Sequence, residues 1–196
     1  MSKKLEVYLS VGSPFAYFSI TQLEMMVERT GCEVEYNLLD LGVIKELADN
    51  PGPAVVPGKL NYLIKDIKDW VEFLGIPFNM PAKFPVTSRE SAAVGRLARE
   101  KGKLNEFVEA LMPAYWVDGK DPSNPEVLAT IGAGVGLDAA EVKAAISDAD
   151  NLAALHKEME AAVKRGVFGV PTFFVGDDMY WGNDRLMFVA NALMDE

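Results

Sequence analysis

The sequence predicts an α/β fold in which a large all-helical insertion separates the two halves of a small β-sheet. Strand patterns occur near the two ends of the chain, within residues 5–41 and 171–181, and no strand-like run interrupts residues 60–164. Because a loop of roughly a hundred residues without structure is rare, the middle is expected to form a helical subdomain. We therefore predict one domain from residues 1–41 and 166–196, and an inserted subdomain from residues 42–165.

The first part of the chain has the pattern of a strand, a helix and a second strand. Apolar and polar residues alternate over residues 5–9, which is typical of a half-buried strand. Ser13 is a favourable N-cap and Pro14 suits the first helical position, so a helix is expected from Pro14 to about Arg29. Residues 32–41 have a second strand pattern. A β-α-β unit of this length predicts parallel strands.

The middle of the chain shows helical signals. Residues 60–74 place their large apolar side chains on one helical face, and Gly75 can end that helix. Asn124 and Asp138 are N-cap residues that begin two further helices. Another helix is expected over about residues 150–165.

The last part of the chain predicts a hairpin followed by a helix. Residues 171–175 and 179–181 are strand-like, and the turn residues 176–178 (Gly-Asp-Asp) separate them. Asn183 or Asp184 can cap the final helix. The predicted order is therefore β-α-β, the helical insertion, then β-β-α.

Composition excludes several classes of function. About half of the 196 residues (49%) are apolar, which is enough for a sizeable core. The net charge of −10 argues against a general nucleic-acid binder and against adhesion to anionic membranes. No apolar run approaches the roughly 18 residues of a membrane span, and the N-terminal residues lack the pattern of a signal peptide. The single Cys32 cannot form an internal disulfide, so a cytoplasmic protein is expected.

The corner between the first strand and the first helix contains no sulfur. Many small redox proteins have a C-x-x-C motif at such a corner, but here Ser13 and Ala16 occupy the two cysteine positions. Cys32 follows the helix and is expected to be buried, so disulfide exchange is disfavoured. With one cysteine and one histidine, His156, a zinc site or a Cys-His nucleophile is also disfavoured, and we predict no metal.

Three motifs in a fixed order resemble a known family. They are Ser13-Pro14-Phe15 at the corner, "GVPT" at residues 169–172, and "WGNDR" at residues 181–185. The chain resembles the 2-hydroxychromene-2-carboxylate isomerases and the kappa-class glutathione transferases, which have the DsbA-like form of the thioredoxin fold. The resemblance covers nearly the whole chain. It implies a thioredoxin-like fold, glutathione as the cofactor, and a homodimer.

The resemblance gives Ser13 a catalytic role, in which its hydroxyl stabilises the thiolate of bound glutathione. A free thiol has a pKa of about 8.5, and lowering it by about two units needs roughly 2.7 kcal/mol. A helix N-terminus supplies about 0.3–2 kcal/mol and a hydrogen bond to an anion about 1.5–3 kcal/mol, so the two together suffice. Without the resemblance, Ser13 is an ordinary helix cap, as Asn124 is before Pro125.

The resemblance also implies how the tripeptide is held. A cis-proline, Pro171, is expected opposite the corner, where the backbone of Val170 would pair with extended glutathione. The γ-glutamyl end would lie against residues of the "WGNDR" motif: Trp181, Gly182, Asn183 and Asp184. The alternatives are a trans-proline that begins a strand and an Asn183 or Asp184 that only caps a helix.

A segment near the start of the predicted insertion, residues 45–59, supplies further candidates. "DNPGPAVVPGK" resembles the N-x-P-P-A-x-V-P-x-K segment of the kappa-class enzymes, with Asn50 as a glutathione contact and Gly52 in place of the first proline. Lys45 matches a lysine of the isomerases and would meet an anionic substrate. Phe15 and Tyr115 would line an apolar substrate pocket. The alternatives are a solvated lysine and core aromatic residues.

Three functions remain open at this point. The first is a glutathione-dependent isomerase that interconverts 2-hydroxychromene-2-carboxylate and trans-o-hydroxybenzylidenepyruvate through a thiolate stabilised by Ser13. The second is a kappa-like transferase, which releases the glutathione conjugate. The third is a thioredoxin-fold module that binds a peptide or protein partner without catalysis. The two enzyme functions take glutathione and a small molecule as partners, with neither nucleic acid nor membrane.

Overall fold

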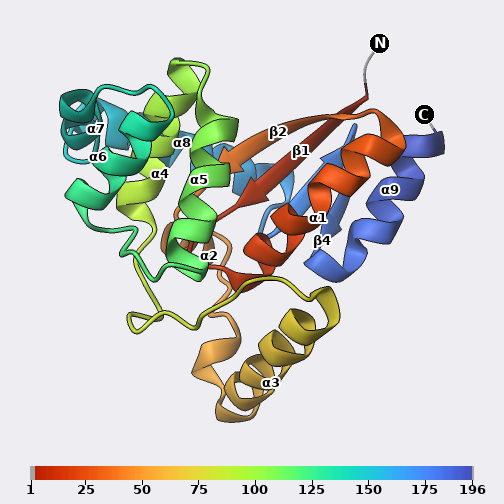
Figure 1. The fold of residues 1–196 in the computed structure, drawn as a ribbon. Helices are drawn as coiled ribbons and strands as arrows, with labels where there is room; N and C mark the ends of the chain where they lie inside the picture. The colour runs from red at the N-terminus through yellow and green to blue at the C-terminus, as the bar shows by residue number, and fades with distance from the viewer. Residues whose placement is uncertain (1–2, 196) are drawn as a thin grey trace.

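The computed structural model describes residues 3–195, and its centre is a four-stranded sheet (Figure 1). The strands are β1 (Lys4–Leu9), β2 (Glu33–Leu38), β3 (Thr172–Val175) and β4 (Asp178–Trp181), in the spatial order β2-β1-β3-β4. β1 and β2 are parallel, and β3 is antiparallel to both β1 and β4. The β-α-β unit and the hairpin are thus confirmed. Residues 1–2 and 196, which the predicted domain boundaries include, lie outside the described residues.

Helices make up most of the described chain. They are α1 (Pro14–Thr30), α2 (Leu41–Leu47), α3 (Pro57–Leu74), α4 (Arg89–Glu100), α5 (Leu104–Trp116), α6 (Pro125–Gly134), α7 (Ala139–Ala145), α8 (Ala149–Arg165) and α9 (Leu186–Asp195), with short 3₁₀ turns η1 (Pro53–Val55) and η2 (Asn183–Arg185). Asn124 and Asp138 accept hydrogen bonds from the first turns of α6 and α7. These two helices therefore begin where the sequence predicts.

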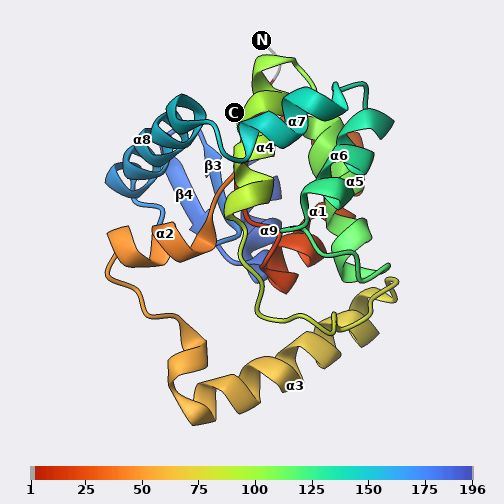
Figure 2. The same cartoon turned by 90° about the vertical axis from the view of Figure 1, so that its left-hand side faces the viewer.

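Apolar side chains cover both faces of the sheet. Leu5, Val7 and Leu9 of β1 are fully buried in a core shared with α1, α5 and α9. Tyr8 points to the opposite face, where α2 and α8 pack against the sheet (Figure 2). The alternation along β1 thus places one apolar core on each side, and the corner after β1 lies at an end of this sandwich.

Two details differ from the sequence prediction, and both have a local cause. β2 ends at Leu38 instead of Leu41, because the Asp40 carboxylate accepts a hydrogen bond from the Gly42 N–H (2.9 Å) and begins α2. Neither Asn183 nor Asp184 caps the last helix. The N-cap of η2 is Gly182, no side chain accepts a hydrogen bond from that first turn, and α9 follows from Leu186.

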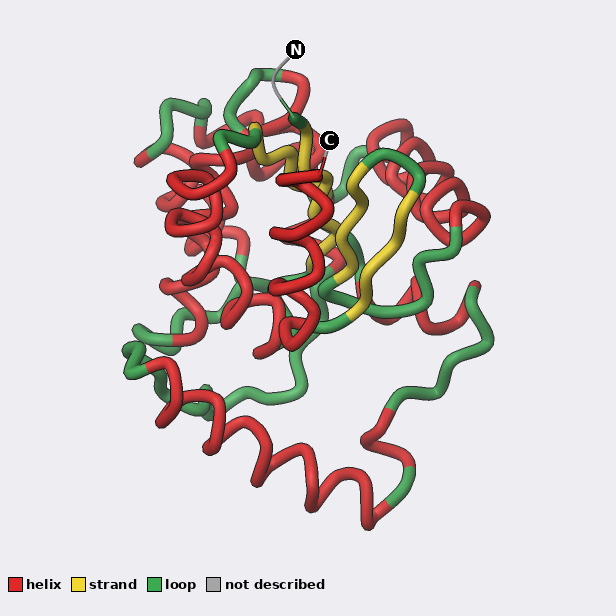
Figure 3. Tube along the Cα trace, turned by 90° about the vertical axis from the view of Figure 1, so that its right-hand side faces the viewer, coloured by secondary structure: helices red, strands yellow, loops and turns green. Residues whose placement is uncertain are grey.

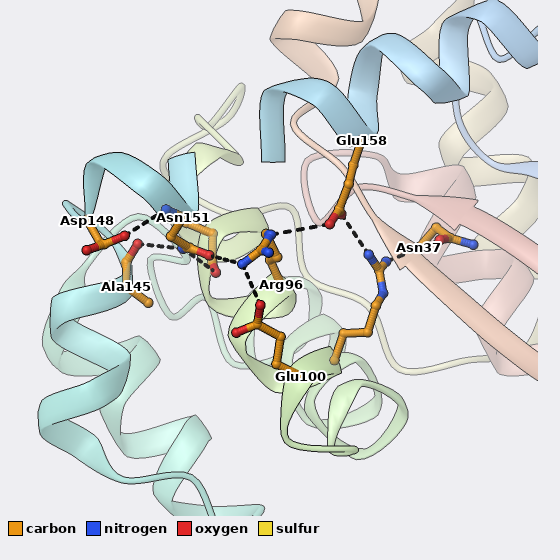
Figure 4. Close-up of polar contacts among 9 residues, drawn as sticks. Asn37, Arg96, Glu100, Ala145, Asp148, Asn151 and Glu158 are labelled. Carbon is orange, nitrogen blue, oxygen red and sulfur yellow. Dashed lines mark hydrogen bonds and ion pairs between the residues drawn. The ribbon is translucent and has the colours of Figure 1, made fainter. Parts of the chain in front are cut away.

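Ion pairs join the helical part of the chain to the sheet (Figure 4). Glu158 of α8 forms ion pairs with Arg96 (to Nε, 3.3 Å) and with Arg99 (to Nη1, 2.7 Å), both on α4. Arg99 also donates to Asn37 of β2 (3.1 Å), and Arg96 donates to Asn151 of α8 (2.9 Å). This network holds α4, α8 and β2 in a fixed arrangement.

Arg165 ties the end of α8 to the sheet just before the loop that leads to β3. Its guanidinium donates to both carboxylate oxygens of Glu6 (2.7 and 3.1 Å) and lies 3.8 Å from the centre of the Phe174 ring. The hydrogen bonds with Glu6 raise the pKa of Arg165 above its usual range. Burial lowers this pKa, but by a smaller amount. The bidentate pair therefore fixes where the loop over residues 166–171 begins.

α3 stands away from the rest of the molecule (Figures 1 and 2). Ile67 is its one buried residue, while Phe73 is 79% exposed. The two ends of the described chain lie on the same side of the sheet (Figure 3), where Lys3 donates to the Leu193 carbonyl. Among residues 3–195, no helix combines the length and the apolar character needed to cross a membrane.

Candidate functional site

Ser13 stands at the N-terminus of α1 with its side chain turned into the protein. It has the extended backbone of an N-cap, is 5% exposed, and its Oγ accepts a hydrogen bond from the Ala16 N–H (3.3 Å). The first turn of α1 contains no acidic residue, so no carboxylate offsets the positive end of the helix dipole. A buried hydroxyl and the positive end of a helix dipole are thus combined at one point.

The loop before β3 lies opposite Ser13. The Val170–Pro171 peptide bond is cis, which confirms the cis-proline that the family resemblance implies. The Ser13 hydroxyl donates to the Val170 carbonyl over 3.4 Å, a long hydrogen bond. Thr172 holds this loop from within by donating to the Gly169 carbonyl (2.7 Å).

Asn50 connects a third segment to the same loop. Its Nδ2 donates to the Phe168 carbonyl (2.9 Å), and its Oδ1 accepts from the Gly52 N–H (3.0 Å). The Phe168 ring in turn lies 4.9 Å from the ring of Trp181, which is 50% exposed. Asn50 therefore supports the backbone just before Val170.

The segment after β4 completes the cluster, since the Gly182 N–H donates to the Pro171 carbonyl (3.0 Å) and η2 packs against α1. Gly182 has a φ of +106°, and a Cβ there would lie 2.5 Å from Asp184 Oδ1, so the turn requires glycine. Asn183 is 5% exposed and its Nδ2 has no hydrogen-bond partner among the described residues. Asp184 is half exposed and lies 3.4 Å from Arg185 Nη2.

A groove of about 330 Å³ runs between the start of α1 and α3. Phe15 forms one wall, and the α3 residues Tyr62, Leu63 and Asp66 form the other. Burial raises the pKa of the Asp66 carboxyl, with smaller contributions from the charges of Asp69 and Asp184. The sequence alone does not mark these α3 residues as lining a groove, because an apolar helical face is also typical of a core helix.

The two other predicted substrate residues lie in different places. Lys45 is partly buried on α2, and its side chain lies against Gly52. Tyr115 is 1% exposed and donates to the Lys83 carbonyl (2.7 Å), and burial raises the pKa of its hydroxyl to about 12. Tyr115 is therefore a core residue and does not line the groove. Cys32 is buried, as expected.

A second hollow, of about 350 Å³, lies at the β2 edge of the sheet. Its walls carry charged residues of both signs, including Lys4, Glu35 and Arg99. Lys4 and Glu35 form an ion pair with each other. None of the predicted site residues borders it. The Ser13 corner, where four segments of the chain meet, is therefore the candidate functional site.

Comparisons with known proteins agree with this geometry. The family model of the DSBA-like thioredoxin domain matches residues 4–194. A 2-hydroxychromene-2-carboxylate isomerase of Sphingobium xenophagum is 34% identical over all of both chains. A solved structure of 2-hydroxychromene-2-carboxylate isomerase superposes with a TM-score of 0.85 at 30% identity, over 97% of this chain and 94% of the other. This chain belongs to the 2-hydroxychromene-2-carboxylate isomerase family of DsbA-like thioredoxin-fold enzymes.

Human glutathione S-transferase kappa 1 is a more distant relative of this isomerase-family member, 23% identical over 98% of this chain and 92% of its own. In this family member hydrogen bonds join the cis-proline loop to the corner segment, to the Asn50 loop and to the turn after β4. The resulting cluster contains the Ser13 hydroxyl at the N-terminus of α1 and the buried, unpaired amide donor of Asn183. Such a set stabilises anionic groups of a small ligand.

Proposed function

We propose that this protein is a glutathione-dependent isomerase that interconverts 2-hydroxychromene-2-carboxylate and trans-o-hydroxybenzylidenepyruvate-like aromatic compounds. The observation that carries the proposal is the position of the Ser13 hydroxyl, which lies at the N-terminus of α1, facing Val170, in a corner without cysteine. The similarity of the chain to 2-hydroxychromene-2-carboxylate isomerases supports the substrate class.

Glutathione supplies a sulfur nucleophile that adds reversibly to a conjugated substrate and leaves unchanged. Ser13 keeps that sulfur anionic by donating its hydroxyl proton in a hydrogen bond. The present hydrogen bond of Ser13 to the Val170 carbonyl is 3.4 Å long, so turning the hydroxyl toward an anion costs little. The N-terminus of α1 adds its dipole at the same point.

The remaining residues of the cluster hold the peptide. The backbone of Val170 pairs with the extended tripeptide, and Pro171 and Gly182 keep that loop in position through their hydrogen bond. Asn183 Nδ2, a buried donor without a partner, fits the α-carboxylate of the γ-glutamyl group. The exposed carboxylate of Asp184 fits its α-ammonium group.

The aromatic substrate occupies the groove beside Phe15. Tyr62 and Leu63 supply its apolar opposite wall, and the volume of about 330 Å³ suits a small bicyclic molecule. Lys45 meets the substrate carboxylate from α2, where its side chain lies against Gly52. Phe15, two residues after Ser13, borders this groove, which supports a substrate position close to the Ser13 corner.

The second candidate function is that of a kappa-like glutathione transferase. It is favoured by the Asn50 loop, which resembles the kappa-class segment, and by the similarity to the kappa-class relatives. A transferase releases the conjugate, whereas an isomerase returns free glutathione. The third candidate, a non-catalytic binding module, predicts partner binding without turnover.

The experiment follows glutathione binding and product formation together. Trp181 is half exposed and packs on Phe168 just before the cis-proline, so we expect its fluorescence to change as glutathione is added, and the Trp181→Phe variant should lose that signal. Calorimetry supplies the affinity, and liquid chromatography separates isomerised product from conjugate. Isomerised product with unchanged glutathione supports the proposal, and accumulating conjugate supports the transferase. Absence of glutathione binding at millimolar concentration supports the binding module.

We propose that the protein is a homodimer and works in the cytoplasm. Large apolar side chains are exposed on α1, α3 and α9, among them Met25, Phe73 and Met187, and a second copy of the chain would cover part of this surface. The single buried Cys32 is suited to a reducing compartment. Light scattering of the eluting protein measures the mass, and a mass near 21 kDa would contradict the dimer.

A further inference from the structure

Lys45 is unusual among the cations of this protein. Among the residues that the structure describes, Lys45 is the one partly buried lysine or arginine whose charged group has neither an ion pair nor a hydrogen bond. The other partly buried cations, such as Arg96, Arg99 and Lys103, all have partners. Because partial removal of an ammonium group from water is unfavourable, a cation of this kind is suited to an anionic ligand.

The backbone of Gly52 provides the space for this side chain. A Cβ atom on residue 52 would lie 2.9 Å from Lys45 Cε and 3.0 Å from Lys45 Nζ. Gly52 has φ +74° and ψ 175°, a conformation essentially restricted to glycine. The proline of the kappa-class segment has φ fixed near −65° and cannot adopt it. The position of Lys45 therefore depends on glycine at residue 52.

This arrangement lies at the rim of the candidate site. Gly52 donates its N–H to Asn50, whose amide holds the loop before Val170, and the next residue, Pro53, borders the groove beside Phe15. The Lys45 side chain, which comes from α2, thus packs against the loop that links the cis-proline segment to the substrate groove.

We propose that Gly52 positions the Lys45 ammonium to recognise the carboxylate of the aromatic substrate, so that this pair sets a preference for anionic over neutral substrates. The inference rests on the proposed function and adds Gly52 to it as a specificity-determining, positioning residue. Lys45 contacts the substrate carboxylate, and Gly52 acts through Lys45.

The test compares two probes, trans-o-hydroxybenzylidenepyruvate and its neutral analogue o-hydroxybenzylideneacetone, which lacks the carboxylate. We expect Lys45→Met to lower the ratio of kcat/KM for the acid over the neutral analogue by about tenfold or more, since a hydrogen bond to a charged group is lost. Lys45→Arg should retain most of the ratio. Gly52→Ala should lower it as Lys45→Met does, and the double variant should be no worse than Lys45→Met alone.

Gly119→Ala is the matched control for backbone strain. Gly119 also has a positive φ (+70°), but a Cβ there meets nothing within 4 Å, so its substitution leaves the selectivity ratio unchanged. An unchanged ratio in Lys45→Met overturns the inference, and so does a normal ratio in folded Gly52→Ala. If Gly52→Ala does not fold, the Lys45→Met and Lys45→Arg results decide the proposal.

A second readout separates this inference from the proposed function. The dissociation constants of both probes, measured by tryptophan fluorescence, give the same selectivity ratio without any turnover. Parent protein that binds the acid selectively through Lys45 but shows no glutathione-dependent turnover contradicts the proposed function alone. Parent protein that turns over with equal selectivity in Lys45→Met contradicts this inference alone.

Discussion

Replacement of Ser13 by alanine should raise the pKa of the bound glutathione thiol by about one to two units. A hydrogen bond from the hydroxyl to a thiolate is worth about 1.5–3 kcal/mol, and each pKa unit corresponds to about 1.4 kcal/mol. The shift is limited because the dipole of α1 remains. In addition, the Ala16 N–H, which donates to Ser13 Oγ in the parent protein, becomes free to face the sulfur. With a parent thiol pKa near 6.5, about two units below the free value, the thiolate fraction at pH 7 should therefore fall roughly three- to twenty-five-fold, and turnover with it.

The assay is the ultraviolet absorbance of the bound thiolate, followed as a function of pH at saturating glutathione. Parent and Ser13→Ala proteins are each titrated, and the difference in midpoint gives the shift directly. Calorimetry supplies the glutathione concentration needed for saturation, so that free thiol does not dominate the signal.

Two variants separate thiolate stabilisation from helix capping. Asn124 caps α6 as Ser13 caps α1, accepting the Glu126 N–H at 2.9 Å, so Asn124→Ala should cost about 0.5–2 kcal/mol of stability. Asn124→Ala should leave the thiol pKa unchanged. Ser10 is fully buried three residues before Ser13, and its hydroxyl has no partner among the described residues. Ser10→Ala should also leave the thiol pKa unchanged, at little or no cost in stability.

The reasoning is refuted if Ser13→Ala binds glutathione and its thiol titrates within about 0.2 units of the parent value. The hydroxyl would then be a helix cap only, and the dipole of α1 would have to account for any lowered pKa. Reduced stability of Ser13→Ala without a change in the thiol pKa has the same meaning.

Three further predictions concern residues around the site and the core. Asn50→Ala removes the donor to the Phe168 carbonyl, so the KM for glutathione should rise about five- to thirtyfold while kcat at saturation changes little; a lower kcat with unchanged KM would contradict the positioning role. Arg165→Lys loses the bidentate pair with Glu6, which is partly solvent-screened, so calorimetry should show a Tm lower by about 2–4 °C and assays an unaltered rate. Burial raises the pKa of Tyr115 to about 12, and an unfolded tyrosine ionises near 10, so ionisation of the unfolded chain should lower stability as pH rises from about 10 to 12. Tyr115→Phe should show a smaller alkaline loss in urea titrations, and an equal loss would refute that assignment.

Local signals in the sequence were sufficient for most elements of the fold. Pro14 after Ser13 and Pro125 after Asn124 mark helix starts that depend only on neighbouring residues, and the Gly176 turn joins β3 to β4. The strand pattern predicts that β2 continues to Leu41, but the strand ends at Leu38. The Asp40 carboxylate begins α2 instead by accepting a hydrogen bond from the Gly42 N–H.

The site was less accessible to sequence reasoning, because it depends on contacts between distant segments. The resemblance gave Ser13 and the cis-proline, but not the hydrogen bond between Asn50 and Phe168, which are 118 residues apart. Periodicity does not distinguish an apolar face that fills a core from one that borders a groove, so the role of Tyr62 went unrecognised. The same ambiguity applies to Tyr115, whose burial follows from the packing of α5.

The burial of the single thiol affects how the protein responds to oxidants and alkylating reagents. Cys32 is 4% exposed, and the helix corner carries a hydroxyl and a methyl group at Ser13 and Ala16 where redox relatives carry sulfur. Peroxide or an alkylating reagent therefore finds no nucleophile of this protein at the corner, since a neutral alcohol does not react under such conditions. Under the proposed glutathione-dependent function, oxidation at this corner would therefore act on the bound tripeptide and not on a side chain of the corner itself.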